Sequence, residues 1–261
     1  MKKLIKGALF FAIAGTVIVG CEKEDSIITT ANQSNNQTKS LNQTQKSANS
    51  PVDLWLTTDS VGIYHNNYLT QATNYAVNNS TLNYLFILDE INYNLGYSEV
   101  EQDNVNNAVY NTTESERLTF LNENLALETY EVLIDLEDVI DQYPADYNAV
   151  NIGLNQVLSD LNFNQFSDFD TYLINGYAET LRSSAYFWYP TSTGGSASGD
   201  AYRVYRGDPV EDVPGLPGWA KADGRSFGWG LVWGTIYTAN PGSGFAAGII
   251  SGVGGSLMYG R

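Results

Sequence analysis

The chain has 261 residues, a formal net charge of −16 and one cysteine, so an intramolecular disulfide is excluded. The acidic side chains concentrate in residues 51–200, where twenty-two Asp and Glu accompany only two basic residues, Arg117 and Arg182. Phosphate backbones repel a block of this charge, so DNA and RNA are excluded as partners.

The N-terminal residues 1–20 have the layout of a signal peptide. Three lysines precede an apolar stretch over residues 8–19, which is too short to span a bilayer stably. The sequence Ile-Val-Gly-Cys at residues 18–21 resembles the lipobox of bacterial lipoproteins. That resemblance implies cleavage before Cys21, lipidation of its thiol, and attachment of the mature chain to a membrane through the lipid. A buried structural thiol and a catalytic nucleophile are the alternatives for Cys21.

Residues 21–57 form the expected tether. Near its start lie Lys23, Glu24 and Asp25, which resemble the surface-export signal of lipoproteins in Bacteroidota and imply an outer-membrane, cell-surface location. The alternatives are a polar start to the tether and a lipoprotein that faces inward from the outer membrane. Asn, Gln, Ser and Thr dominate the rest of the segment, which has too little apolar surface to become ordered.

Between residues 58 and 189 the apolar residues recur with helical spacing, and strand alternation is nowhere sustained. Short connections between such segments favour an antiparallel bundle with one core, so the sequence predicts an all-α fold. The clearest apolar stripe runs from Leu118 to Tyr143 and is closed by Pro144. About five helices are expected, at residues 59–76, 81–95, 118–143, 146–161 and 166–189.

Residues 190–223 break the helical pattern. A Gly and Ser run covers residues 191–199, and Pro209, Pro214 and Pro217 follow among glycines. This composition predicts an extended linker between the bundle and the C-terminal segment.

The C-terminal segment, residues 224–261, is rich in glycine and has small residues at every fourth position in two series. Asn240 and Pro241 lie between the series and predict a turn. Small residues spaced by four line one side of a helix, so a helical hairpin with a closely packed glycine-zipper interface is expected. The expected interface residues are Ser226, Gly230, Gly234, Gly244, Gly248, Gly252, Ser256 and Gly260. The large apolar residues expected on the outer faces include Trp229, Trp233, Phe245 and Ile249.

This segment resembles the glycine-zipper regions of membrane-associated bacterial proteins and, in composition, small two-peptide bacteriocins. Each expected helix has about 13–16 apolar residues, whereas roughly 20 are needed to cross hydrocarbon. Four roles therefore stay open for the hairpin: packing against the bundle, self-association with a second copy, binding of a protein partner, and contact with a membrane.

Candidate catalytic residues are few. His65 is the only histidine and has no carboxylate three or four positions away, so a hydrogen-bonded packing residue is favoured over a metal ligand. Glu137 and Asp138 are expected on a solvated helix face rather than as glycosidase carboxylates. Arg117 and Arg182 are expected to form ion pairs, with a clamp for a ligand carboxylate as the alternative. No catalytic residue, metal ion or cofactor is predicted.

The chain also resembles uncharacterised lipoproteins of Bacteroidota. The similarity lies in His65 and Asn66 of the first helix, the sequence Ser-Ala-Tyr-Phe-Trp at residues 184–188, and the Gly-rich tail. It implies no particular activity. The favoured hypothesis is a non-enzymatic, lipid-anchored surface protein that serves interaction or assembly. The alternative is a membrane-active, bacteriocin-like effector acting through residues 224–261, and the third hypothesis is an enzyme acting through His65.

Overall fold

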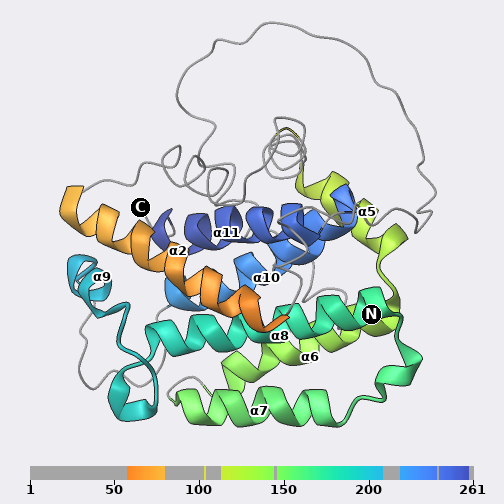
Figure 1. Cartoon of the computed structure of the whole chain (residues 1–261), viewed down its shortest axis with the longest axis horizontal. Helices are drawn as coiled ribbons and strands as arrows, with labels where there is room; N and C mark the ends of the chain where they lie inside the picture. Colours follow the sequence, from red (N-terminus) through yellow and green to blue (C-terminus); the bar gives the residue numbers. More distant parts are fainter. Residues whose placement is uncertain are drawn as a thin grey trace, which may run out of the picture.

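The computed structural model describes residues 58–79, 103, 113–143, 146–207, 218–239 and 241–258. Regular structure in these residues is helical throughout, which confirms the all-α helical bundle (Figure 1). The α-helices are α2 (Thr58–Asn79), α5 (Glu114–Asn124), α6 (Leu127–Gln142), α7 (Tyr147–Ser159), α8 (Asp168–Trp188), α9 (Asp200–Tyr205), α10 (Gly218–Thr238) and α11 (Pro241–Met258). Predictions that fall outside the described residues are the signal peptide 1–20, the tether 21–57 with Cys21, Lys23, Glu24 and Asp25, the helix over 81–95, the side chain of Ser256, and Gly260.

Helix α8 is the scaffold of the bundle. It packs against α10, α2, α6 and α7. Figure 1 shows α7 at the bottom, α6 and α8 above it, the α10–α11 hairpin above these, and α2 crossing α8 obliquely. The apolar stripe of α8 explains this position, because Leu173, Tyr177, Leu181 and Trp188 are all buried along its length.

Local side chains fix the starts of two of the helices. Thr113 caps α5, and it exchanges hydrogen bonds with Glu116 in a capping box. The carboxylate of Asp146 accepts hydrogen bonds from the backbone N–H groups of Asn148 and Ala149 at the start of α7. Both caps satisfy N–H groups that the first turn of a helix leaves without a partner.

The single helix expected over residues 118–143 is wrong, because α5 and α6 divide this stretch. Leu125 and Ala126 lie between them with extended backbones, at ψ values of 127° and 141°. Neither residue is a helix breaker, so the break has no local cause. The break accompanies a change of surroundings, because α5 contacts α10 whereas α6 packs on α7 and α8 and also meets α10 through Glu137.

The expected linker is also more structured than its composition suggests. Where the structure describes it, at residues 190–207 and 218–223, the chain forms α9 and the start of α10, which begins at Gly218. A Cβ added at Gly199 would lie only 2.2 Å from the ring of Trp188. Glycine here permits close packing on the end of α8, so an extended linker is wrong for these residues.

Helices α10 and α11 share one core with the bundle. Trp229 packs against Tyr177 of α8, and Trp233 packs against Phe120 of α5, with ring centroids 5.6 and 5.1 Å apart. Phe245 of α11 is also buried. These residues lie on the faces of the hairpin that point away from its glycine interface, as expected, and the structure packs those faces against the bundle, which was one of the roles left open for the hairpin. Within the described ranges, no helix has both the length and the apolar character needed to cross a membrane.

Candidate functional site

Small residues allow α10 and α11 to approach closely. A Cβ added at Gly234 would lie 2.8 Å from Cα of Gly244, and one added at Gly248 would lie 2.9 Å from the backbone oxygen of Phe227. These distances are shorter than ordinary van der Waals contacts, so larger side chains would push the helices apart. The expected interface glycines that face the other helix of the hairpin are Gly230, Gly234, Gly244, Gly248 and Gly252, and Ser226 is buried.

A second row of glycines on α10 faces α8 and was missed by sequence reasoning. A Cβ at Gly228 would lie 2.5 Å from the ring of Tyr177, and one at Gly224 would lie 3.0 Å from Cβ of Ser184. The signal was present in the i,i+4 spacing of these two glycines, two positions away from the first row. The two rows of glycines let α10 lie close to both α11 and α8. Polar side chains of α10 can therefore reach buried partners on neighbouring helices.

The first buried polar cluster surrounds Asp223 of α10, which has no exposed surface. Ser184 and Trp188 of α8 donate hydrogen bonds to its Oδ2 over 2.6 and 3.0 Å. Nε2 of His65 in α2 lies 3.3 Å from Oδ1 and 3.2 Å from Oδ2. One carboxylate thus joins three helices that are far apart in the sequence.

The surroundings of His65 favour its charged form. Its Nδ1 lies 2.8 Å from the side-chain oxygen of Asn66, so both ring nitrogens face acceptors. Burial lowers the pKa of His65, but the negative charge of Asp223 and the hydrogen bonds to Asp223 and Asn66 outweigh burial and raise it above its usual 6.5. The ring also meets Phe227 edge to face, with centroids 4.7 Å apart. These contacts make His65 a hydrogen-bonded packing residue.

The Asp223 cluster does not have the geometry of a nucleophilic triad. The hydroxyl of Ser184 donates to Asp223 and not to His65, so no base is placed to activate it. His65 and Ser184 are each only 3% exposed, so a substrate reaches neither without separating α2, α8 and α10. In the part of the chain that the structure describes, no group of three or more His, Cys, Asp and Glu side chains could hold a metal ion.

The second polar cluster surrounds Glu137 of α6, and its position corrects the expectation of a solvated face. Glu137 is only 5% exposed. Trp229 and Tyr177 donate hydrogen bonds to its Oε2 over 3.3 and 3.4 Å. Nε of Arg225 lies 3.2 Å from its Oε1. Arg225 of α10 therefore has a buried counter-ion on α6.

This second cluster continues from the core to the surface. Nη2 of Arg225 lies 2.7 Å from Oδ2 of Asp141, and Nζ of Lys221 lies 3.1 Å from Oδ1. Burial raises the pKa of Glu137 to about 7, although the charge of Arg225 opposes the shift. Partial burial also raises the pKa of Asp141. The positive charges of Arg225 and Lys221 and their hydrogen bonds outweigh burial and hold the pKa of that carboxyl below its usual value.

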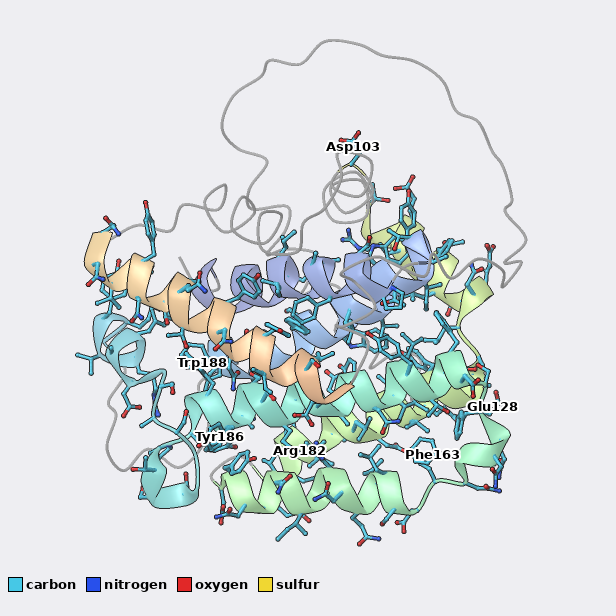
Figure 2. The ribbon with its side chains drawn as sticks, in the orientation of Figure 1. Asp103, Glu128, Phe163, Arg182, Tyr186 and Trp188 are labelled. Atoms are coloured by element: carbon cyan, nitrogen blue, oxygen red, sulfur yellow. The ribbon has the colours of Figure 1, made fainter. Side chains whose placement is uncertain are left out.

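A pocket of about 290 Å³ opens between α2, α7 and α8. Tyr147 of α7 and Tyr186 of α8 line it, with ring centroids 5.3 Å apart and ring planes inclined by 62°. Figure 2 shows Tyr186 and Arg182 on the side of α8 that faces α7. Asn66 lines the pocket from α2 and connects it to the Asp223 cluster through His65. The other lining residues are Gly62, Ile63, Glu179, Arg182 and Ser183.

Arg182 is held rigidly at this pocket. Its Nε and Nη2 donate hydrogen bonds to the side-chain oxygens of Asn151 and Asn155, each over 2.8 Å, and its Nη1 pairs with Glu179. The expected ion pair of Arg182 is thus present, together with two α7 partners that sequence reasoning did not identify. Arg117, the other expected member of an ion pair, is buried in α5.

Asp223 is the most important residue that sequence reasoning missed. His65 and residues 184–188 are separate motifs in the sequence, and Asp223 is the side chain that joins them. The only available signal was an isolated acid immediately before a glycine-rich helical pattern. No protein-family model, curated protein or solved structure matches the chain.

Proposed function

We propose that the chain is a lipid-anchored protein of the bacterial outer membrane whose helical head binds a partner at the cell surface. The lipobox-like sequence at residues 18–21 supports anchoring through Cys21. Lys23, Glu24 and Asp25 support export to the surface. The negative charge of the helical head is repelled by anionic lipid headgroups, which supports attachment through the lipid and not through the surface of the head.

The burial of the hairpin is the observation that carries this proposal. Trp229, Trp233, Phe245, Ile249 and their neighbours on α10 and α11 contribute to the core of the head. Their apolar surface is already used within the chain, so membrane attachment is assigned to Cys21. An effector role through residues 224–261 would first require both helices to leave that core.

A binding role is favoured over catalysis because the residues with catalytic potential stabilise the fold. His65, Ser184 and Asp223 are buried together, and each makes hydrogen bonds that connect helices. The α2/α7/α8 pocket, in contrast, is open and is lined by side chains that can bind a ligand.

The anchor is tested by substitution of Cys21 in the full chain. Cys21→Ser is expected to abolish labelling by radioactive palmitate and to release the protein into the soluble fraction. A triple Ala substitution of Lys23, Glu24 and Asp25 is the matched variant. This variant is expected to keep the lipid label but to resist protease that is added to intact cells, because it is no longer exported to the surface. A Cys21→Ser protein that resists detergent-free washing of membranes would show that another segment is the anchor.

A liposome assay separates this proposal from the effector alternative. The soluble Cys21→Ser protein is expected to leave dye-loaded vesicles intact, because its apolar hairpin residues are buried. Dye release that depends on the hairpin, and that is lost when Gly248→Leu disturbs it, would favour the effector.

A further inference from the structure

Two tyrosines give the α2/α7/α8 pocket an aromatic wall. Tyr186 is 43% exposed, and Tyr147 is partly buried. Neither phenol hydroxyl has a hydrogen-bond partner among the residues that the structure describes. Both hydroxyls and the exposed surface of Tyr186 are therefore available to a ligand.

The polar groups of the pocket include fixed donors and fixed acceptors. Arg182 uses three of its five N–H groups on Asn151, Asn155 and Glu179, and these bonds orient the remaining two. The carboxylate of Glu179 also accepts a hydrogen bond from Ser183 over 3.3 Å and keeps further lone pairs. A ligand that both donates and accepts hydrogen bonds suits this lining.

The charge balance of the pocket favours a neutral ligand. Arg182 and Glu179 cancel one another, so the pocket itself does not select an ion. The acidic residues of the surrounding head disfavour an anion, and the carboxylate of Glu179, which Arg182 already neutralises, gives a cation no unopposed counter-charge. Among neutral ligands, a polyhydroxylated ring has hydroxyls on its edge that donate and accept, and C–H groups on its faces that pack on an aromatic ring.

The size of the pocket limits the ligand further. Its volume of about 290 Å³ is at the lower end of the range for small-molecule sites, which begins at roughly 300 Å³. One ring fills such a space. Ile63 at the pocket is 63% exposed, so the rest of a longer molecule can extend into solvent.

The geometry points to a saccharide site, in which one sugar residue packs on the ring of Tyr186 and the hydroxyls of the sugar bind Arg182, Glu179 and the hydroxyl of Tyr186. This inference rests on the proposed function of the head as a surface binding module, and it names the ligand class.

The test uses the mature chain carrying Cys21→Ser, which has no lipid and is studied in solution. The probes are the methyl glycosides of glucose, galactose, mannose and N-acetylglucosamine, with binding followed by saturation-transfer NMR and by titration. At least one glycoside is expected to bind saturably. Tyr186→Ala is expected to weaken that binding by about tenfold or more, because it removes the stacking surface. Tyr143→Ala, at a residue with a similar 41% exposure outside the pocket, is expected to change the affinity by less than about twofold.

Three results would overturn the saccharide site. The first is no binding of any of the four glycosides. The second is binding that Tyr186→Ala leaves unchanged. The third is competition by acetate or tetramethylammonium, which would assign the pocket to an ion.

If the Ala variant does not fold, Tyr186→Phe keeps the ring and is expected to weaken binding by about threefold through loss of one hydroxyl. An unchanged affinity in that variant also counts against the site. Because this assay takes place in solution, its failure leaves the Cys21 localisation result standing, and the reverse also holds.

Discussion

The two polar clusters of α10 begin only two residues apart, yet they differ in design. Asp223 is enclosed, and its carboxylate is fully used by His65, Ser184 and Trp188. Arg225 lies on a path that leads outward from the core to Asp141, whose side chain is 54% exposed. The difference indicates that the enclosed cluster fixes the position of α10 against α2 and α8. The open cluster instead makes the stability of the fold depend on the pH and salt concentration of the solution.

The largest expected effect comes from breaking the enclosed cluster. Asp223→Ala leaves His65 buried without the carboxylate that pairs with its charged form, and it removes the acceptor for Ser184 and Trp188. Loss of one partner of a buried ion pair costs about 3–5 kcal/mol in the free energy of unfolding. Asp141→Ala is the matched change in the open cluster and is expected to cost about 1 kcal/mol or less. Urea denaturation measures both, and equal losses would remove the distinction between the clusters.

The open cluster is expected to make stability depend on pH. The pKa of Glu137 is raised to about 7, so the folded state binds a proton that the unfolded state releases near pH 4.5. The free energy of unfolding should therefore fall by about 3 kcal/mol as the pH rises from about 4.5 to 7. The raised pKa of His65 acts in the same direction, because its contribution is complete below about pH 6.5 and is lost as the pH rises through its folded-state pKa. Asp141 has a lowered pKa and acts oppositely, at the acid end.

Glu137→Gln isolates this pH effect. The variant should lose most of the decline between pH 4.5 and 7, whereas Glu131→Gln at an exposed position of the same helix should keep it. Thermal denaturation at a series of pH values provides the comparison. If the midpoint temperature changes with pH in the same way in Glu137→Gln and in the unmodified chain, Glu137 does not titrate as its burial implies.

The glycine contacts hold both clusters in place, because they set the position of α10 against α11. Gly248→Leu is expected to cost about 1–3 kcal/mol, since the added side chain would collide with the backbone of Phe227. Ile249→Leu, which conserves volume at the next residue, should cost less than about 1.5 kcal/mol. Resistance of the tail to protease gives a second measurement. Equal resistance in the two variants would mean that the glycines do not form a tight interface.

The smallest effect is expected at the outer end of the open cluster. Lys221→Ala breaks an ion pair with a largely exposed carboxylate, so it should change the free energy of unfolding by less than about 1 kcal/mol. The change should shrink further at 1 M salt, because exposed charges are screened. A large, salt-independent loss would instead show that Lys221 belongs to the buried part of the cluster.

Helix spacing predicted much of this architecture because each helix of the bundle has a continuous apolar stripe. The stripe of α8 and the small residues of α10 and α11 are periodic features of the local sequence. The break at Leu125 was not predictable, since no breaking residue marks it and the packing of α6 on α7 and α8 is set by residues far away in the sequence. Pairing was also hidden: Asp223 lies 158 positions from His65, and the burial of Glu137 depends on α10, which follows it by about eighty residues. A charge that is buried by a distant helix has the same local sequence as one in solvent.

Hydrogen exchange of the full chain tests most directly whether the hairpin belongs to the core. Amides of α10 and α11 should be protected to the same extent as those of α8 and should open with the same free energy, because one core joins the three helices. Exchange of α10 and α11 that is many times faster than that of α8, and that stays unchanged in Asp223→Ala, would contradict this account and show that the hairpin is an appendage.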